Sequence, residues 1–267
     1  MSSLMEILTI DQIDEDHFIT RVMQPEFPGL YGGQVAAQSL LAACRTIAPE
    51  QLPHSLHAYF LRSGRSALPI ELEVFRDRDG RSFSARRVVA SQAGEVIFNM
   101  SASFQFPEDG PSVQAMTMPK LEPAHGPGVR REPQMTPDIE LVNAAPVPGR
   151  PMPDKTWTRA TVELPDDPQI HACVLTFVSD FFTGLVQFDE YPEHARTASL
   201  DHAMWFYRPT DMRTWHLMDW HAQSMAHGRG HYIGHIYDAS GRLVAGIGQE
   251  MVVRASRSRL AHGQPVG

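Results

Sequence analysis

The sequence has few cysteines, no long apolar run and no excess of basic charge. Only two cysteines, Cys44 and Cys173, occur in the chain, and both lie in apolar stretches. Two thiols cannot form the disulfide framework typical of small secreted proteins, so we expect buried free thiols and a cytoplasmic, reducing location. No stretch of about 18 consecutive apolar residues is present, so no membrane-spanning helix is predicted.

The charge and the missing motifs exclude several classes of protein. A net charge of −8 argues against nonspecific binding of nucleic acid, which requires a basic surface. The chain lacks the Gly-x-Ser-x-Gly turn of serine hydrolases, the phosphate-binding loop of nucleotide-binding proteins and the His-Glu-x-x-His motif of zinc peptidases.

A repeated histidine could suggest a metal site. His227, His231 and His235 recur at every fourth residue, but glycines interleave them, and the pattern predicts a turn followed by a strand. A strand would spread these side chains too far apart for one ion. We therefore expect neither a metal nor a cofactor.

The proline distribution predicts how the 267 residues are divided. Most of the 21 prolines lie between Pro107 and Pro168, and proline at that density blocks helices and central strands. We predict an N-terminal unit over residues 1–106, an extended proline-rich connector over 107–155, and a C-terminal unit with a short tail over 156–267. A hydrophobic content of 42% is enough for a core without disulfides or metals.

Each unit is predicted to contain one helix followed by four strands, from the period of its apolar residues. In the N-terminal unit the helix is expected over Val35–Ile47, and the strands over Leu56–Phe60, Pro69–Arg76, Ser82–Ser91 and Val96–Phe104. In the C-terminal unit the helix is expected over about Ile170–Gln187, and the strands near Thr197–Tyr207, Trp215–Gln223, Gly230–Tyr237 and Leu243–Val253.

Short matches between the units indicate a tandem duplication. Leu56-His57-Ala58 is similar to Asp201-His202-Ala203 at an offset of 145, Gly80-Arg81 to Gly228-Arg229 at 148, and Gly94 to Gly241 at 147. A helix wrapped by a meandering antiparallel sheet is an α+β unit of the hotdog kind. Two such units in tandem predict a double hotdog, in which the sheets pair as one pseudo-dimer.

Three polar side chains in apolar surroundings are candidate catalytic residues. Asp180 follows an almost wholly apolar segment, residues 172–179, so we expect its carboxylate to be partly desolvated and to act as a base or to orient water. The alternative is a helix-end aspartate that reaches solvent. Ser199 lies on a predicted strand, and Gln249 lies in the apolar run of the last strand, where its amide must find hydrogen-bond partners.

Several segments together resemble the acyl-CoA thioesterase II family. They are residues 164–175 with Val178-Ser179-Asp180, residues 198–206, residues 241–245 with Gln249-Glu250, Tyr31-Gly32-Gly33-Gln34 and His54-Ser55-Leu56-His57. The resemblance spans roughly residues 25–254 and implies a double hotdog that hydrolyses the thioester of fatty acyl-CoA. It also implies that Asp180, Ser199 and Gln249 form a triad that activates water for direct attack on the thioester carbonyl.

The same resemblance extends to substrate binding and assembly. We expect acyl-CoA contacts from Gly32, Gly33, His57, Arg62 and Arg229, with backbone N–H groups of a glycine-rich helix start serving the oxyanion. Arginines that could meet the phosphates of coenzyme A also include Arg86, Arg87, Arg208 and Arg254. Further association of pseudo-dimeric chains into a homo-oligomer is expected.

Two other functions remain open from the sequence. A hotdog hydratase or dehydratase acting on enoyl-CoA would need His171 or His202 to face Asp180. A catalytically silent module that binds acyl-CoA would need no triad at all.

Overall fold

The computed structural model describes residues 2–21, 29–121, 136–144, 154–181, 184–192 and 195–255. Within these residues no helix is long and apolar enough to cross a membrane.

The first half consists of one central helix and six strands, with one short helical turn before them. They are α1 (Leu4–Ile7), β1 (Ile10–Asp14), β2 (His17–Thr20), α2 (Gly32–Cys44), β3 (Leu52–Phe60), β4 (Glu71–Asp79), β5 (Phe83–Gln92) and β6 (Glu95–Gln105). Helix α2 has no glycine or proline after Gly33, and its residues from Gly33 to Cys44 are all buried, as expected of a central helix.

The second half has the same plan. Its elements are β7 (Ile139–Asn143), β8 (Lys155–Ala160), α3 (Pro168–Val178), the 3-10 turn η1 (Gly184–Gln187), β9 (Ala195–Ser199), β10 (Asp201–Phe206), β11 (His216–Ala226), β12 (Arg229–Asp238) and β13 (Leu243–Ala255). Helix α3 begins sharply because Asp167 caps it by accepting a hydrogen bond from Gln169 N at 2.9 Å, and Pro168 takes the first helical position.

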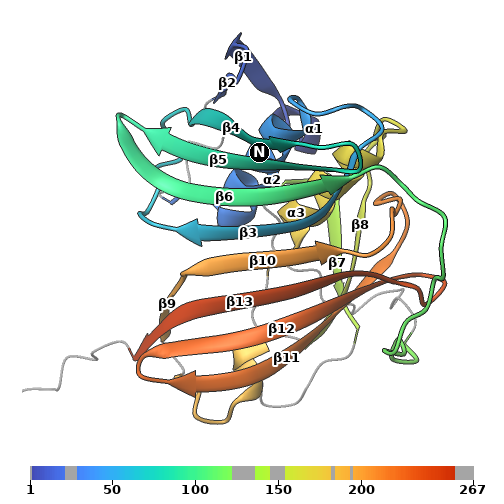
Figure 1. The fold of residues 1–267 in the computed structure, drawn as a ribbon. Helices are drawn as coiled ribbons and strands as arrows, with labels where there is room; N and C mark the ends of the chain where they lie inside the picture. Colours follow the sequence, from blue (N-terminus) through green and yellow to red (C-terminus); the bar gives the residue numbers. More distant parts are fainter. Residues whose placement is uncertain are drawn as a thin grey trace, which may run out of the picture.

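The described strands form one antiparallel sheet (Figure 1), in the order β1-β2-β4-β5-β6-β3-β10-β13-β12-β11-β8-β7, with β9 also paired to β13. The two halves meet in the middle, where Asp201–Trp205 of β10 pairs with Ser55–Tyr59 of β3. One continuous sheet therefore crosses both halves of the chain.

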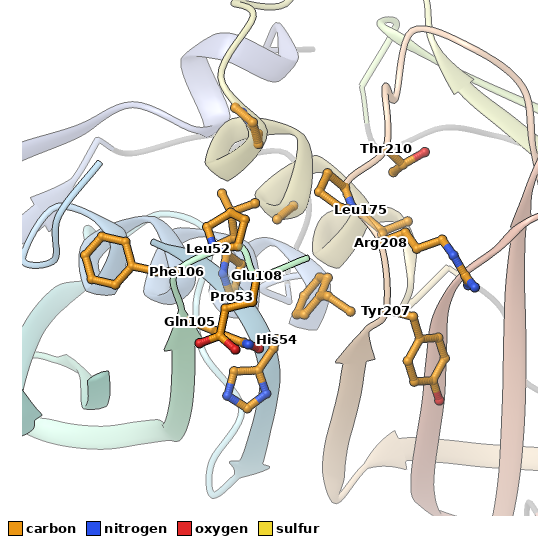
Figure 2. A pocket seen from close by; sticks show the side chains of 15 residues that line it. Leu52, Pro53, His54, Gln105, Phe106, Glu108, Leu175, Tyr207, Arg208 and Thr210 are labelled. Carbon is orange, nitrogen blue, oxygen red and sulfur yellow. The ribbon is translucent and has the colours of Figure 1, made fainter. Parts of the chain in front are cut away.

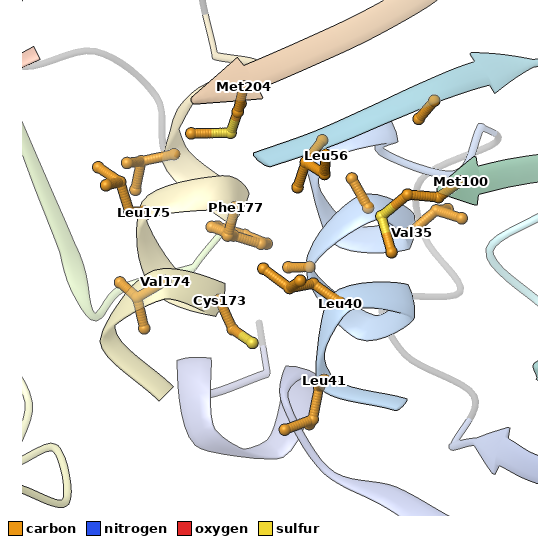
Figure 3. Close-up of a cluster of buried hydrophobic side chains, with 14 of the residues drawn as sticks. Val35, Leu40, Leu41, Leu56, Met100, Cys173, Val174, Leu175, Phe177 and Met204 are labelled. Atoms are coloured by element: carbon orange, nitrogen blue, oxygen red, sulfur yellow. The ribbon is translucent and has the colours of Figure 1, made fainter. Parts of the chain in front are cut away.

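Helices α2 and α3 pack against each other on one side of this sheet. Figure 3 shows Leu40 of α2 facing Cys173 and Phe177 of α3, and all three side chains are at most 1% exposed. Cys44 and Cys173 are both buried free thiols, as predicted. A single hydrophobic cluster spans the helices and both halves of the sheet.

In the first half, the predicted order of one helix and four strands is confirmed by α2 and β3 to β6. In the second half, α3 is followed by five strands, β9 to β13, and several boundaries differ. The second helix was predicted to reach Gln187, whereas α3 ends at Val178 with Ser179 as its cap. The strand predicted over Thr197–Tyr207 is interrupted at Leu200, which separates β9 from β10. The segment predicted as a connector, 107–155, contains one strand, β7, which pairs with β8. Residues 122–135 and 145–153 of this segment lie outside the described residues. Elements α1, β1 and β2 were not predicted.

The repeat is present, but one of its matches was shifted by a residue. Ala93-Gly94 and Gly241 lie in the last turn of each half, as the matching glycines predicted, and Ala93 and Gly94 have the positive φ angles (50° and 80°) that a tight hairpin requires. His57, however, points to the exposed face, whereas His202 is buried. The offset of 145 between them is therefore wrong.

The correct offset follows from equivalent hydrogen bonds after the central strands. In the first half, Leu61 N and Arg62 N both donate to Ile97 O, and in the second, Tyr207 N and Arg208 N both donate to Val244 O. Leu61 is therefore equivalent to Tyr207, at an offset of 146. The same offset makes Leu56 the first-half equivalent of His202. The irregularity of β3 between Pro53 and Ser55 then corresponds to the interruption at Leu200.

Candidate functional site

Asp180 lies where α3 ends and is held at the wall of a cavity. The helix ends at Val178 with Ser179 as its cap, and the Ser179 hydroxyl donates to Thr176 O at 2.8 Å. Asp180 is then the second residue beyond the helix, and its partly exposed side chain lines a cavity of about 330 Å³. The sequence left two alternatives for Asp180, a partly desolvated carboxylate or one that reaches solvent. In the structure the Asp180 carboxylate is buried on most sides and lines this cavity.

Three elements bring Asp180, Ser199 and Gln249 together. Gln249 Nε2, on β13, donates to Asp180 Oδ1 and to Ser199 Oγ, both at 2.8 Å. The Ser199 hydroxyl, at the end of β9, lies 3.5 Å from Asp180 Oδ1 and is oriented to donate to it. Ser199 and Asp180 face the cavity, whereas Gln249 is 1% exposed and lies behind them.

His202 fixes the orientation of the Gln249 amide by a hydrogen bond to its oxygen. Because Gln249 Nε2 faces two oxygens, its Oε1 must point the other way, where it accepts a short hydrogen bond from His202 Nδ1. His202 Nδ1 is therefore the donor of this hydrogen bond. His202 Nε2 in turn lies 2.8 Å from Ser179 Oγ, and the imidazole is 1% exposed.

The start of α2, from the other half of the chain, closes the site. The backbone N–H of Gly33 donates to the Asp180 carboxylate. A Cβ on Gly32 would lie 2.6 Å from Asp180 Oδ2, and one on Gly33 would lie 2.5 Å from Phe177 O, so neither position has room for a side chain. Tyr31 joins the two helices because its hydroxyl donates to Phe177 O at 2.7 Å.

Burial raises the pKa of Asp180 above its ordinary value. Four features oppose this rise: the nearby His202, and hydrogen bonds donated by Gln249, Gly33 and Ser199. The carboxylate is thus held in a surrounding that disfavours its charge but supplies directed donors. Such a group is a competent proton acceptor near neutral pH.

The rest of the cavity is mainly apolar with one arginine. Its other lining residues are Leu30, Gly32, Val35, Phe60, Leu61, Arg62, Ser63, Gly64, Ile97, Phe98, Ala198 and Leu200. The Arg62 guanidinium donates from Nη1 to Val96 O at 2.7 Å and lies 3.3 Å from Glu95 Oε2. The cavity can therefore hold an apolar chain beside one positive charge.

Not every residue expected to bind substrate lies at this cavity. Gly32 and Arg62 line it and Gly33 bonds Asp180 at its edge, but His57 packs edge-on against Trp205 on the exposed face of the sheet. Arg229 pairs with Glu250 at 2.8 Å.

The other arginine candidates have structural partners. Arg86 is 1% exposed and bonds Thr46 and Asp79, Arg87 lies over the ring of Phe75, and Arg254 is exposed at the end of β13. Arg208 lines a different cavity.

His202, Ser179 and Tyr31 are site residues that the sequence did not single out for these roles. The sequence did contain an indication that His202 is buried. Residues two apart on a strand share one face, so His202 and the apolar Met204 face the core together. Among the described residues, no cluster of three His, Cys, Asp or Glu side chains could hold a metal ion. His227 forms a turn and His231 and His235 lie on β12, as predicted.

The buried carboxylate predicts a gain of stability in Asp180→Asn. Because the folded-state pKa is raised, ionisation of Asp180 destabilises the folded protein, and this cost is present above the folded pKa and disappears as the pH falls to the unfolded pKa. We expect a higher free energy of unfolding for Asp180→Asn at pH 7, measured with urea, and a smaller difference at pH 4.

Asp109→Asn, in an exposed segment, is the matched control and should not change stability at either pH. Equal or lower stability of Asp180→Asn at pH 7 would contradict the desolvation of this carboxylate.

Two family profiles together match most of the chain. The acyl-CoA thioesterase N-terminal domain matches residues 23–105, and the acyl-CoA thioesterase C-terminal domain matches residues 107–253. Acyl-CoA thioesterase 2 of Haemophilus influenzae is 32% identical, covering 96% of this chain and 98% of that protein. Human acyl-coenzyme A thioesterase 8 is 31% identical, covering 93% and 88%.

Solved structures agree with these matches. The crystal structure of an acyl-CoA thioesterase II from Mycobacterium marinum is 38% identical, with a TM-score of 0.79 over 98% of this chain and 99% of that one. A protein from Alicyclobacillus acidocaldarius described as having a hot dog fold is 20% identical, with a TM-score of 0.74 over 94% and 97%, and this likeness shows the fold. The chain belongs to the acyl-CoA thioesterase II family.

Proposed function

We propose that this protein hydrolyses fatty acyl-CoA to a free fatty acid and coenzyme A, with a water molecule activated by Asp180, Ser199 and Gln249. The observation that carries the proposal is the hydrogen-bonded cluster of these three side chains at the wall of an apolar cavity. The names of its relatives, acyl-CoA thioesterases at 31–38% identity over most of the chain, point to the same thioester hydrolysis.

The water would bind between Asp180 and Ser199. Asp180 Oδ2 is the oxygen on the Gly32 side, and Oδ1 already accepts from Gln249 Nε2, so Oδ2 is the one left to take a proton. The water oxygen attacks the thioester carbonyl as its proton passes to Asp180. The C–S bond then breaks, and the same proton is returned to the sulfur of coenzyme A. No covalent acyl-enzyme is needed, in keeping with a sequence without a nucleophile turn.

The oxyanion that forms at the carbonyl requires donors that are already in place. The start of α2 supplies backbone N–H groups that have no acceptor within the helix, and its dipole favours negative charge. The Gly33 N–H is already used by Asp180. The absence of a side chain on Gly32 is what lets a substrate carbonyl approach this helix end.

The acyl chain would lie along the apolar wall formed by Leu30, Val35 and Phe98. Arg62 is the arginine best placed to meet a phosphate of coenzyme A at the mouth of the cavity. Roles for His57 and Arg229 in binding stay predictions, and they would concern parts of coenzyme A outside the cavity.

We also propose that the architecture is a double hotdog. Its units are residues 1–106 and 156–267, and the segment 107–155 joins them and adds β7 to the edge of the common sheet, beside β8. Support comes from the repeated order of helix and strands, the packing of α2 on α3, and the antiparallel pairing of β3 with β10. A cytoplasmic role in lipid metabolism and assembly into a homo-oligomer complete the proposal.

The alternative of an enoyl-CoA hydratase loses its main support. It required a histidine facing Asp180 across the substrate, but His202 is 1% exposed and committed to Gln249 and Ser179. His171 Nδ1 accepts a hydrogen bond from Met212 N near the opposite end of α3.

Asp180→Asn should abolish most hydrolysis, because asparagine cannot accept the proton of water. We expect kcat to fall by about 10²-fold or more, measured by release of free thiol across acyl-CoAs of short to long chain. Asp109→Asn serves again as the control. A folded Asp180→Asn protein with wild-type turnover would remove Asp180 from the mechanism.

The pH dependence should report the raised pKa of Asp180. Activity requires the ionised carboxylate, so kcat/KM should decline as the pH falls through the pKa of Asp180. Because burial raises that pKa, we expect the decline at a pH above the ordinary aspartate value of about 3.9. A profile that stays flat down to pH 4 in folded protein would contradict Asp180 as the base.

His202→Leu should lower kcat by about tenfold or more with little effect on KM. Leucine is tolerated at the equivalent position of the first half, Leu56, but it cannot hold the Gln249 amide in place. Loss of a hydrogen bond of about 1.4 kcal/mol corresponds to a tenfold loss of rate. The control is His231→Leu, on the exposed side of β12. Equal kcat values for the two variants would show that His202 does not position Gln249.

A further inference from the structure

A second cavity of about 240 Å³ lies at the other end of the helix pair (Figure 2). It is lined by the start of β3, the end of β6 with the residues after it, the first turns of α3, and the segment that follows β10. None of the residues that line it belongs to the cavity beside Asp180.

The two cavities are nevertheless built from equivalent stretches of the two halves. Residues 198–200 and 60–64 line the cavity beside Asp180, and residues 52–54 and 206–210 line the second one. Adding 146 converts 52–54 into 198–200 and 60–64 into 206–210. This is the same offset that the backbone hydrogen bonds of the two halves established.

The equivalence extends to individual side chains and hydrogen bonds. Phe60 corresponds to Phe206, and Arg62 corresponds to Arg208. The Arg62 guanidinium donates from Nη1 to Val96 O at 2.7 Å, and that of Arg208 donates from Nη1 to Leu243 O at 2.6 Å. Each cavity therefore has one arginine at the same place, held from Nη1 by a backbone carbonyl. The rest of the guanidinium differs, since Arg62 lies beside Glu95, whereas Arg208 donates to Ser112 Oγ and Val113 O.

Each cavity is also lined by residues from one of the two central helices, α2 for the cavity beside Asp180 and α3 for the second cavity. Gly32 and Val35, in the first turn of α2, line the cavity beside Asp180, while Pro168, Ala172 and Leu175 of α3 line the second. The pair of cavities thus follows the approximate twofold relation between the halves.

The second cavity lacks the reacting groups. At the positions of Ser199, Gln249 and His202, offset by 146 or 147, the first half has Pro53, Ala102 and Leu56. No residue that follows α2 lines the cavity in the way that Asp180, which follows α3, lines the other. The cavity keeps an arginine and several apolar side chains, and its other polar lining residues include His54, Gln105, Glu108 and Thr210, but it has no equivalent of the Asp180, Ser199 and Gln249 cluster.

We propose that this second cavity is a non-hydrolytic binding site for acyl-CoA. The inference rests on the proposed function, since its ligand is inferred from the equivalence with the cavity beside Asp180. The apolar side chains of Leu52, Leu175 and Phe206 suit the acyl chain, and Arg208 suits a phosphate of coenzyme A. His54 and Glu108 also line this cavity, with His54 Nε2 2.8 Å from Ser103 Oγ, but no cluster equivalent to Asp180, Ser199 and Gln249 is there to hold a water, so a bound thioester is retained and not cleaved.

The test is the number of ligands bound per chain. The probe is an acyl-CoA analogue in which a thioether replaces the thioester, titrated into the full-length protein by calorimetry. We expect two sites per chain in the wild type. In Ala172→Phe, where a ring fills the second cavity, we expect one site per chain, with the thiol-release activity of the other cavity retained.

Val35→Phe is the matched variant, because it fills the cavity beside Asp180. It should also bind one analogue per chain, but it should lose thiol release. If Ala172→Phe does not fold, Arg208→Ala takes its place and should weaken the second site at least tenfold.

One site per chain in a wild type that hydrolyses acyl-CoA would overturn this inference and leave the proposed function standing. Two sites in folded Ala172→Phe would also overturn it, because the second ligand would then lie elsewhere. Wild-type protein that cleaves no acyl-CoA would instead refute the proposed function, so the two failures are distinguishable.

Discussion

The antiparallel pairing of β3 with β10 is the contact on which the rest of the structure depends. It joins the two halves into one sheet and sets α2 against α3, so that the start of one helix meets the end of the other. The site exists only at such a junction, because Asp180 comes from the second half while the N–H of Gly33 that bonds it comes from the first. Neither half alone contains both the carboxylate and the helix start, so the site requires both halves of the chain.

At this junction, burial of the Asp180 carboxylate destabilises its charged form and raises its pKa. An ionised carboxylate in a mostly apolar wall is unfavourable, and the folded protein tolerates it because three donors converge on it from different elements. Those donors are themselves fixed, since His202 sets the rotation of the Gln249 amide and Ser179 contacts the other nitrogen of His202. The polar network is therefore continuous from the end of α3 to the last strand, and it meets the cavity at Asp180 and Ser199.

The sequence was sufficient for the central helix of each half and the strands that follow it, and it singled out three polar side chains that lie together in the structure, but it was not sufficient for the geometry between them. The period of apolar residues located α2 and α3, yet it carried the second helix past its true end at Val178, because Phe181 and Phe182 continue the apolar pattern and no glycine marks the stop. Likewise, a match at an offset of 145 paired His57 with His202, although one faces solvent and the other the core. A shift of one residue reverses the face of a strand, and only hydrogen-bond register could reveal it.

The same register shows that the two halves share equivalent backbone hydrogen bonds around the two cavities, although only one cavity is lined by Asp180 and Ser199. The backbone after each central strand makes the same hydrogen bonds in both halves, and the arginine at each cavity is held by the same kind of carbonyl. Holding a ligand depends on these backbone-determined features, whereas cleaving it depends on a few side chains that point into the cavity. Replacing Ser199, Gln249 and His202 by the apolar residues of the other half would leave the frame unchanged, because Pro53, Ala102 and Leu56 already occupy it there. Under the proposed function, binding and hydrolysis are therefore separable, because the frame around the two cavities is shared while Asp180 and Ser199 line only one of them.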